Sequence, residues 1–247
     1  MRIGVVIPTL NEAAHIHATV ASALAQDPAV VVVADCGSVD GTADHARAAG
    51  ARLVTGPALT SRAAALQAGI DHALTLHPDL EVLWLLHGDS LAPETGRAAI
   101  ESVLADPAVV AGAFTQRFAL RGHRPTYIQR RLLRFIIFCN RTRYRFTHVY
   151  FGDQGLFVRP GALAQIGGIP QLPLMEDVEL CQRLKTVGKL RLSPVGLATS
   201  PRRFLKHGIL RQGFRDARLL LAHRRGRDAA DQHHQYNLDN HQPGLSS

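Results

Sequence analysis

The segment 82–86 constrains the fold more than any other stretch of this chain. It is a short apolar run, Val-Leu-Trp-Leu-Leu, that leads directly into the polar turn 87–90, His-Gly-Asp-Ser. A continuous apolar run of this length, followed at once by a turn, is typical of a strand buried on both faces of a parallel sheet. In open α/β sheets, ligands bind beyond the carboxyl ends of the strands. We therefore expect Asp89 to lie at a binding site.

The first half of the chain alternates such runs with helical segments. Asn11 and Asp40 belong to the residue types that favour helix N-caps, and they are expected to begin the first two helices. Strands alternating with helices of about 10 to 15 residues predict βαβ units and therefore an α/β fold with a mostly parallel sheet flanked by helices. The expected strands are Ile3–Ile7, Val30–Ala34, Arg52–Val54, Val82–Leu86 and Val109–Arg117, and the expected helices are Ala13–Ala25, a helix from Asp40 to Gly50, Ser61–Leu76 and Glu94–Leu104.

The pattern changes in the second half of the chain. The segment 121–145 is dense in arginine around the apolar centre 135–138. The polar, histidine-rich residues 227–247 lack the apolar content of a packed core, and we expect them to be disordered. Between these segments we expect a strand within Val149–Val158, a helix over Glu176–Val187 that ends at Gly188, a strand at Leu190–Leu192 and a basic amphipathic helix over Phe204–Arg224.

The composition indicates a folded protein with an anionic partner. Hydrophobic residues make up 46% of the 247 residues and charged residues 19%, which is unlike a disordered chain. The net charge of +8 favours nucleotide phosphates, acidic lipid headgroups or nucleic acid as partners. Because the sequence does not interleave aromatic residues with a basic sheet, we expect no nucleic acid partner. The sequence does not indicate an oligomeric state.

The cysteines and the apolar runs indicate the cellular compartment of the protein. Cys36, Cys139 and Cys181 are odd in number and far apart, so they suggest no disulfide framework and favour a reducing compartment. No run reaches the roughly 18 apolar residues of a membrane-spanning helix. The first apolar run is interrupted by Pro8 and indicates a strand, not a signal peptide. We therefore expect a cytoplasmic protein.

Three aspartates, Asp35, Asp89 and Asp177, lie where strands end or helices begin. Each alone is as well explained by the local hydrogen bonds that favour Asp in turns. Because the carboxyl ends of parallel strands share one edge of a sheet, we expect Asp35 and Asp89 to face the same crevice. Asp35 is suited to a nucleotide base or ribose, and Asp89 to Mg²⁺ or Mn²⁺, which prefer oxygen ligands and substrate phosphates. His87 is a further candidate metal ligand, although a histidine in a turn is more often a polar surface residue.

Acidic residues also fill the first turn of the helix expected at Glu176–Val187. Complementation of the helix dipole would explain them, at about 0.3–1 kcal/mol for each acid. The functional alternative is a general base that removes a proton from an acceptor hydroxyl, and the residues leave Glu176 and Asp177 as equal candidates. Arg62, Arg202 and Arg203 are suited to clamp a diphosphate, or else are solvated surface charges.

Several well-known ligand motifs are absent from the sequence. No GxGxxG follows the first strand, no GxxxxGK[ST] occurs, and no GxSxG is present. These absences argue against a dinucleotide-type Rossmann site, a P-loop and a hydrolase nucleophile elbow. The histidines also lack the spacing of a zinc site.

Four short segments in a fixed order resemble the family 2 glycosyltransferases with the GT-A fold. They are 8–12 (Pro-Thr-Leu-Asn-Glu), 35–42 (Asp-Cys-Gly-Ser-Val-Asp-Gly-Thr), 87–90 and 176–177 (Glu-Asp). Three more, Gly152–Gln154, Met175–Leu180 and Ser200–Arg203, are similar to a small bacterial subgroup with HxD(T/S), GDQ and MEDVEL motifs. The resemblance covers about residues 1 to 226.

The resemblance implies a single GT-A domain over residues 1–226, Rossmann-like, with a basic C-terminal helical region. Residues 1–117 would be the nucleotide-sugar-binding half and residues 118–226 the acceptor and catalytic half. The implied activity is hexosyltransferase-like: a metal-dependent transfer of a sugar from a nucleotide-diphosphate donor to an acceptor hydroxyl, with inversion. Two alternatives stay open, a nucleotidyltransferase acting on a sugar phosphate and a catalytically decayed nucleotide-sugar-binding protein.

The resemblance also implies roles for individual residues. Asp89, with His87, would bind Mg²⁺ or Mn²⁺, and Asp177, with Glu176 beside it, would be the catalytic base. His87 stands where many relatives carry the first acid of a DxD motif, and Cys36 stands where many carry a second Asp. The nucleotide-sugar would contact Pro8, Thr9, Glu12, Asp35, Arg62 and Asp89, together with Arg202 and Arg203.

The stretch Tyr127–Phe138 combines arginines with aromatic and aliphatic residues in an amphipathic pattern. One hypothesis is that it lies on the anionic inner face of a membrane, close to a lipid-linked acceptor. The alternative, which we favour, is a helix that packs on the domain and keeps its arginines in solvent.

Overall fold

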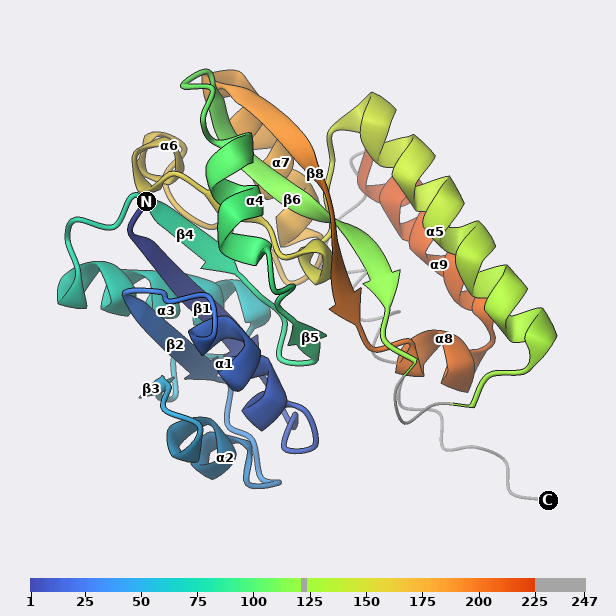
Figure 1. Ribbon diagram of the computed structural model, residues 1–247, viewed down its shortest axis with the longest axis horizontal. Helices are drawn as coiled ribbons and strands as arrows, with labels where there is room; N and C mark the ends of the chain where they lie inside the picture. Colours follow the sequence, from blue (N-terminus) through green and yellow to red (C-terminus); the bar gives the residue numbers. More distant parts are fainter. Residues whose placement is uncertain (121–123, 225–247) are drawn as a thin grey trace.

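The computed structural model describes residues 1–120 and 124–224, which form an α/β domain around one sheet (Figure 1). The tail expected at residues 227–247 lies outside the described residues. The described strands form an eight-stranded sheet in the order β3-β2-β1-β4-β7-β6-β8-β5. The strands are β1 (Ile3–Thr9), β2 (Val30–Asp35), β3 (Arg52–Thr55), β4 (Val82–Leu85), β5 (Ser90–Leu91), β6 (Val109–Phe118), β7 (Phe157–Val158) and β8 (Lys189–Thr199).

Helices cover both faces of the sheet, and the alternation of side chains along the strands explains why. Val5 and Ile7 of β1 belong to a buried cluster with α1, α2 and α4, whereas Val6 belongs to a second cluster with α3, α6 and α7. Successive residues of a strand point to opposite faces, so a continuous apolar strand needs helices on both sides. The helices are α1 (Ile16–Leu24), α2 (Thr42–Ala48), α3 (Arg62–Leu76), α4 (Gly96–Val103), α5 (Tyr127–Thr147), α6 (Pro160–Gln165), α7 (Glu176–Val187), α8 (Arg202–His207) and α9 (Ile209–Arg224), with a 3-10 turn η1 at Gly152–Gln154.

The predicted mostly parallel sheet is confirmed, with antiparallel pairs added in the second half. β3, β2, β1 and β4 are parallel neighbours, and so are β6 and β8. The short β7 lies antiparallel between β4 and β6, and β5 pairs antiparallel with β8. The helix predicted at Glu176–Val187 has those bounds, and Gly188 follows it. Ser61 caps α3 by accepting a hydrogen bond from the Ala64 N–H at 3.1 Å.

Three predictions about the second half are confirmed in kind but had the wrong extent. The strand expected within Val149–Val158 is confined to β7, because η1 and the left-handed Gly155 (φ 58°) turn the chain before it. The strand expected at Leu190–Leu192 extends over the whole of β8, which pairs with β6 and shifts register between Ser193 and Gly196. That shift accommodates Pro194, which cannot donate to a regular ladder. The single helix expected at Phe204–Arg224 is divided at Gly208 (φ 85°) into α8 and α9.

The predicted N-cap Asn11 was wrong, and Asp40 lies one residue before the N-cap of its helix, where its side chain still accepts a hydrogen bond from the Thr42 N–H at 3.1 Å. The helix expected from Ala13 begins as α1 at Ile16, and the N-cap of α2 is Gly41. Asn11 is left-handed (φ 54°) and its side chain accepts a hydrogen bond from the Val39 N–H at 3.1 Å, while Asp40 accepts one from the Ala13 N–H at 3.1 Å. Both side chains therefore join the β1–α1 loop to the β2–α2 loop. The loops that follow two neighbouring strands are held as one unit.

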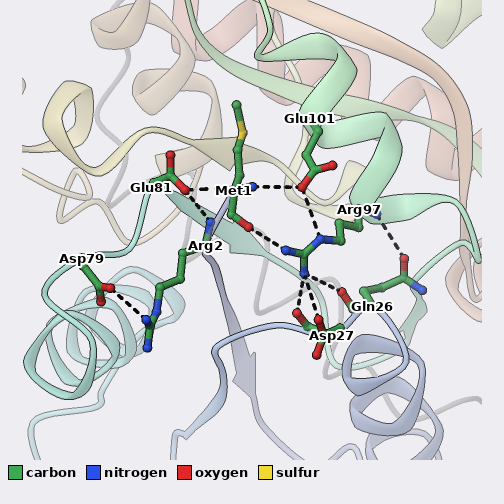
Figure 2. Close-up of polar contacts among 8 residues, drawn as sticks. All are labelled: Met1, Arg2, Gln26, Asp27, Asp79, Glu81, Arg97 and Glu101. Carbon is green, nitrogen blue, oxygen red and sulfur yellow. Dashed lines mark hydrogen bonds and ion pairs between the residues drawn. The ribbon is translucent and has the colours of Figure 1, made fainter.

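A polar network fixes the opposite end of β1 (Figure 2). The Arg97 guanidinium on α4 donates to the carbonyl oxygens of Met1 at 2.8 Å and of Gln26 at 3.2 Å, and it pairs with Glu101 at 3.2 Å. These contacts hold α4 against the start of β1 and against the turn after α1. Since β1 runs from this network to Thr9, the network lies at the end of the strand away from the carboxyl-end loops.

Helices α5 and α9 lie side by side at the edge of the domain (Figure 1). A capping box begins α5, in which Thr126 accepts from the Gln129 N–H at 3.2 Å and the Gln129 side chain accepts from the Thr126 N–H at 2.8 Å. Within residues 1–120 and 124–224, no helix has the length and apolar content needed to cross a membrane.

Candidate active site

The carboxyl ends of β1 and β2 place Thr9 and Asp35 side by side. The Thr9 hydroxyl donates to Asp35 Oδ1 at 3.1 Å, and the Ser38 N–H donates to Oδ2 at 2.9 Å. Asp35 is therefore buried and oriented by its own loop. The neighbouring Cys36 is partly buried, and burial followed by the charge of Asp35 raises the pKa of its thiol. Pro8 lies inside β1, opposite Ala34, and is buried in the sheet.

The turn after β4 brings Asp89 to the same edge of the sheet. A Cβ placed at Gly88 would lie 3.0 Å from Thr9 Cγ2 and 3.1 Å from Glu12 Cγ, so the turn packs closely on the end of β1. The Thr19 hydroxyl of α1 donates to the Gly88 carbonyl at 2.9 Å and fixes this approach. Asp89 is thereby positioned beside Glu12 and next to the Thr9–Asp35 pair.

Arg202, at the start of α8, forms ion pairs with both acids. Its Nη2 atom lies 3.5 Å from Asp89 Oδ2 and also pairs with Glu12. The Glu12 and Asp89 side chains are 15% and 14% exposed, so two nearly buried carboxylates share one cation. The second oxygen of Glu12 is buried and has no hydrogen-bond partner among the described residues. The side chain of the predicted Arg203 lies outside the described part of the structure.

This donor set fits a hard divalent cation in part. Carboxylate oxygens are the ligands that Mg²⁺ and Mn²⁺ prefer, and the unpartnered Glu12 oxygen beside Asp89 is of that kind. No group of three or more His, Cys, Asp or Glu side chains able to hold a metal occurs in the described residues. Mg²⁺ sites commonly use one or two carboxylates and take their other ligands from substrate phosphates and water. The pair can therefore hold a cation together with a diphosphate, but not as a closed protein cage.

The predicted acids of α7 form a second group. The Gly152 N–H donates to Asp177 Oδ2 at 2.7 Å, and Arg62 pairs with Glu176 and lies 3.7 Å from Asp177 Oδ2. Burial raises the pKa of Glu176, the Arg62 charge opposes this, and the Asp177 charge adds to it. The Asp177 side chain is 15% exposed against 7% for Glu176, which leaves Asp177 the more accessible acid.

Gly152 connects the two groups, and a Cβ at this position shows how closely they pack. It would overlap Arg62 Nη2 and would lie 2.6 Å from His87 Nε2. His87 and Asp89 belong to the same turn, so the contacts of Gly152 place Asp177 next to the turn that carries Asp89. The structure thus brings together the predicted residues Thr9, Glu12, Asp35, Arg62, His87, Asp89, Glu176, Asp177 and Arg202 around one edge of the sheet.

The sequence did not predict that Gly152 would contact both groups of the site, and it did not indicate Arg143 at all. Gly152 was noted only as part of the short segment Gly152–Gln154. Nothing in the local sequence indicates that an arginine and a histidine from distant segments meet there. The Arg143 guanidinium on α5 lies against the rings of Tyr144 and Phe151, 4.4 Å and 4.2 Å from their centroids, and these rings are nearly perpendicular to each other. The signal for Arg143 was present only as one arginine among many in a basic segment.

Comparisons with known proteins agree with this architecture. Solved structures of glucosyl-3-phosphoglycerate synthase from Mycobacterium tuberculosis are similar to this chain. The complex with Mn²⁺, UDP and glucosyl-3-phosphoglycerate has a TM-score of 0.62 and 19% identity, covering 92% of this chain and 80% of that chain. The complex with Mn²⁺, UDP-glucose and glycerol 3-phosphate has a TM-score of 0.57 and 19% identity, covering 79% and 70%. At this identity the similarity establishes the GT-A-like fold alone.

The sequence comparisons establish the family. None of the curated proteins searched matches this chain. The profile of the family described as "Glycosyl transferase family 2" matches residues 4–163, a segment that contains Thr9, Asp35, Arg62, Asp89 and Gly152 and ends before Asp177. Because this match spans more than half of the sequence, the chain belongs to glycosyl transferase family 2 and is a glycosyltransferase.

Proposed function

We propose that this enzyme transfers a hexose from a nucleotide-diphosphate sugar to an acceptor hydroxyl, with inversion and with Mg²⁺ or Mn²⁺ bound. One observation carries the proposal. The 87–90 turn contacts Gly152. The carboxylates of Glu12 and Asp89 lie on one side of this contact, and the carboxylate of Asp177 lies on the other. Such an arrangement suits a reaction in which one acid group holds a cation on the leaving group and another accepts a proton.

The donor side of the site would be built by β1, β2 and the 87–90 turn. Asp35, oriented by Thr9 and Ser38, would accept hydrogen bonds from the base or ribose, with Pro8 and Thr9 beneath it. Asp89, with the free oxygen of Glu12, would hold the cation, and His87 is the further candidate ligand. When bound, a divalent cation supplies charge neutralisation for a departing diphosphate. The Mn²⁺ complexes of the mycobacterial synthase support this choice of metal.

The arginines would complete the diphosphate site. Arg202 pairs with the two acids that would hold the cation, and Arg62 pairs with Glu176. Either guanidinium can exchange a carboxylate for a phosphate, because both anions accept its paired N–H groups. Arg203 stays a sequence-based candidate for the same role. Cations placed at the departing diphosphate stabilise the charge that grows there in the transition state.

The acceptor side would centre on Asp177. Its Oδ2 accepts the Gly152 N–H at 2.7 Å, which fixes the carboxylate, and the side chain is partly accessible. Asp177 would remove the proton of the acceptor hydroxyl as the hydroxyl attacks the anomeric carbon. Glu176 is buried against Arg62 and would position that guanidinium rather than take the proton. This division assigns residues 1–117 to the donor and residues 118–226 to the acceptor, and the GDQ and MEDVEL segments of the bacterial subgroup both lie in the second part.

A panel of nucleotide-sugars tests the proposal through stability. We expect one UDP-, GDP- or dTDP-sugar to raise the unfolding temperature in the presence of Mn²⁺, and to do so much less without it. A ligand at a hundredfold its Kd stabilises by about 2.7 kcal/mol, which corresponds to several degrees for a chain of this size. The Asp89→Asn variant should lose the dependence on metal.

The released product separates this proposal from its alternatives. We expect a nucleoside diphosphate, whereas a nucleotidyltransferase acting on a sugar phosphate would release pyrophosphate from a nucleoside triphosphate. A decayed binding protein would be stabilised by the donor and would release neither. Stabilisation by no nucleotide-sugar, with or without metal, would contradict the proposal.

We also propose that α5 and α9 contact an anionic membrane surface. Phe135 and Phe138 on α5 and Phe214 on α9 are 55%, 65% and 75% exposed. Exposed arginines, among them Arg131 and Arg134, lie on the same helix as the first two. An apolar row with arginines beside it suits the boundary between anionic headgroups and acyl chains. The opposite side of α5 packs on the domain through Leu133 and Tyr144, so the predicted packing and a membrane contact are compatible.

Sedimentation with liposomes tests the membrane contact. We expect the enzyme to sediment with vesicles that contain anionic lipid and to stay in solution with neutral vesicles. Phe138→Ser should weaken this binding, while Leu76→Ser, which changes an exposed leucine at the end of α3, should not. Equal sedimentation with both kinds of vesicle, or with none, would rule out the contact.

A further inference from the structure

Arg143 carries a buried cation whose terminal nitrogens lack hydrogen bonds of good geometry. Its guanidinium lies against the rings of Tyr144 and Phe151, which are nearly perpendicular to each other, at 88°. The terminal nitrogens Nη1 and Nη2 are both buried, and neither forms a hydrogen bond of standard geometry among the described residues. The guanidinium is close enough to the Tyr144 hydroxyl to oppose the rise in the pKa of that phenol.

Such an arrangement calls for a ligand. Buried polar groups are almost always satisfied, and a buried charge without an anion is costly. The two aromatic rings stabilise the cation, but ring faces accept no strong hydrogen bonds. The terminal nitrogens of a guanidinium match the paired oxygens of a carboxylate or a phosphate. An ordered water is the other way to satisfy these donors, and it predicts no binding of anions.

The position of Arg143 relates it to Asp177. Phe151, which stacks on the guanidinium, directly precedes Gly152, whose N–H holds the Asp177 carboxylate at 2.7 Å. Cys181, one turn after Asp177 on α7, is close to both charges. Burial, with a smaller contribution from the Asp177 charge, raises the pKa of its thiol to about 12, against the opposing effects of the Tyr150 backbone and of the Lys185 and Arg143 charges. The cation and the proposed base therefore lie in one neighbourhood, on the side of the site proposed for the acceptor.

Polar groups border the cation on the same side. The Asn140 amide, one turn before Arg143 on α5, donates to Gln116 Oε1 at 3.1 Å, and the Gln116 amide donates to Asp153. Asp153 is close enough to the buried Tyr144 that its charge, after burial, raises the pKa of that phenol. These amide and carboxylate groups suit the hydroxyl groups of a small polyol.

We propose that Arg143 binds an anionic group of the acceptor, a phosphate or a carboxylate, and holds the acceptor with its hydroxyl toward Asp177. Arg143 is then a specificity residue that selects anionic acceptors over neutral ones. This inference rests on the proposed function, because it assumes that Asp177 faces an acceptor.

The test compares three small probes that differ in charge. Glycerol 3-phosphate carries a phosphate, glycerate carries a carboxylate, and glycerol carries neither. Their binding to the full chain is measured by calorimetry, with and without Mg²⁺ and the nucleoside diphosphate that matches the donor found in the stability panel. We expect at least one anionic probe to bind ten times or more as tightly as glycerol, and the better of the two identifies the group that Arg143 prefers.

Variants of α5 assign that preference to Arg143. Arg143→Met keeps an apolar stem against the two rings and should remove the preference, while Arg143→Lys should keep part of it. Arg47→Met is the control, because Arg47 is an exposed arginine of α2 that pairs only with the exposed Asp44, at 2.8 Å, among the ion pairs of the described residues. This control should bind as the unmodified enzyme does.

The outcomes separate the two proposals. If anionic probes bind no tighter than glycerol, or if Arg143→Met binds them as well as the unmodified enzyme, the role of Arg143 is wrong and an ordered water is the better explanation. If no donor is found, the proposed function fails on its own. The difference between the unmodified enzyme and Arg143→Met without nucleotide still decides whether Arg143 binds anions. Should Arg143→Met fail to fold, Arg143→Lys is compared with the unmodified enzyme instead. If both proteins bound the anionic probes equally, and no tighter than glycerol, the proposal would be contradicted.

Discussion

We expect Asp177→Asn to lower kcat by about 10²- to 10⁴-fold, the range found when a general base is removed. The amide keeps an oxygen that can accept the Gly152 N–H, so the loop and the fold should be preserved. The donor should still raise the unfolding temperature with Mn²⁺, because Asp89 and Glu12 are unchanged. The measurements are steady-state turnover with saturating donor and acceptor, and the donor-induced shift in unfolding temperature.

Glu179→Gln is the matched control for this prediction. Glu179 lies in the same first turn of α7, but it pairs with Arg183 at 2.8 Å along the helix. We expect its turnover to stay close to that of the unmodified enzyme. If Asp177→Asn also kept nearly full turnover while Glu176→Gln lost it, the base would be Glu176 and the assignment made here would be wrong.

Gly152→Ala should lower kcat/KM by about 10²-fold and should also lower the unfolding temperature, because displacing Arg62 leaves the buried Glu176 without its cation. The added methyl group would overlap Arg62 Nη2 and would approach His87 Nε2 to 2.6 Å, so both side chains must move. Arg62 is the flexible end of a long side chain and can give way without damage to the core. In moving it would leave Glu176 and Asp177, and a displacement of about 1 Å in a positioning group can cost about 10²-fold in rate.

Gly161→Ala provides the comparison, since a Cβ at Gly161 in α6 meets nothing within 4 Å. That variant should keep full activity and be slightly stabilised, because alanine is the better helix former. Complete loss of the folded state in Gly152→Ala would mean that the packing of the loop, and not the placement of Arg62, explains the loss of activity. Full activity in Gly152→Ala would show that the contact with Arg62 is not needed for catalysis.

The first half of the fold could be predicted from the sequence because its signals are local. The buried strands β1, β2 and β4 follow from continuous apolar runs, α3 begins at the cap Ser61, and α7 ends before Gly188. Periodicity, capping and glycine at a helix end act over a few residues, so they can be read without knowledge of the rest of the chain. The same local reasoning located the acids at the strand ends.

Local reasoning failed where distant segments compete for the same groups. Asn11 and Asp40 belong to residue types that favour N-caps, yet Asn11 binds the neighbouring loop instead, and Asp40 binds that loop as well as the Thr42 N–H of its own helix. β8 is long although it contains Pro194, because β6 pairs along its length and shifts register to pass the proline. In each case a tertiary contact outweighed a local preference of similar size.

The sequence alone therefore determined the α/β class, the edge of the sheet where a ligand would bind, and the acids expected there. It could not determine which cation meets which acid. Arg202 reaches Glu12 and Asp89, and Arg62 reaches Glu176. Arg143 meets the rings of Tyr144 and Phe151 only when the sheet and α5 are in place. The physical reason is the distance along the chain over which each interaction acts. Apolar periodicity is set by neighbours along the chain, whereas charge pairing depends on distances of a few ångströms between segments that the folded sheet alone brings together.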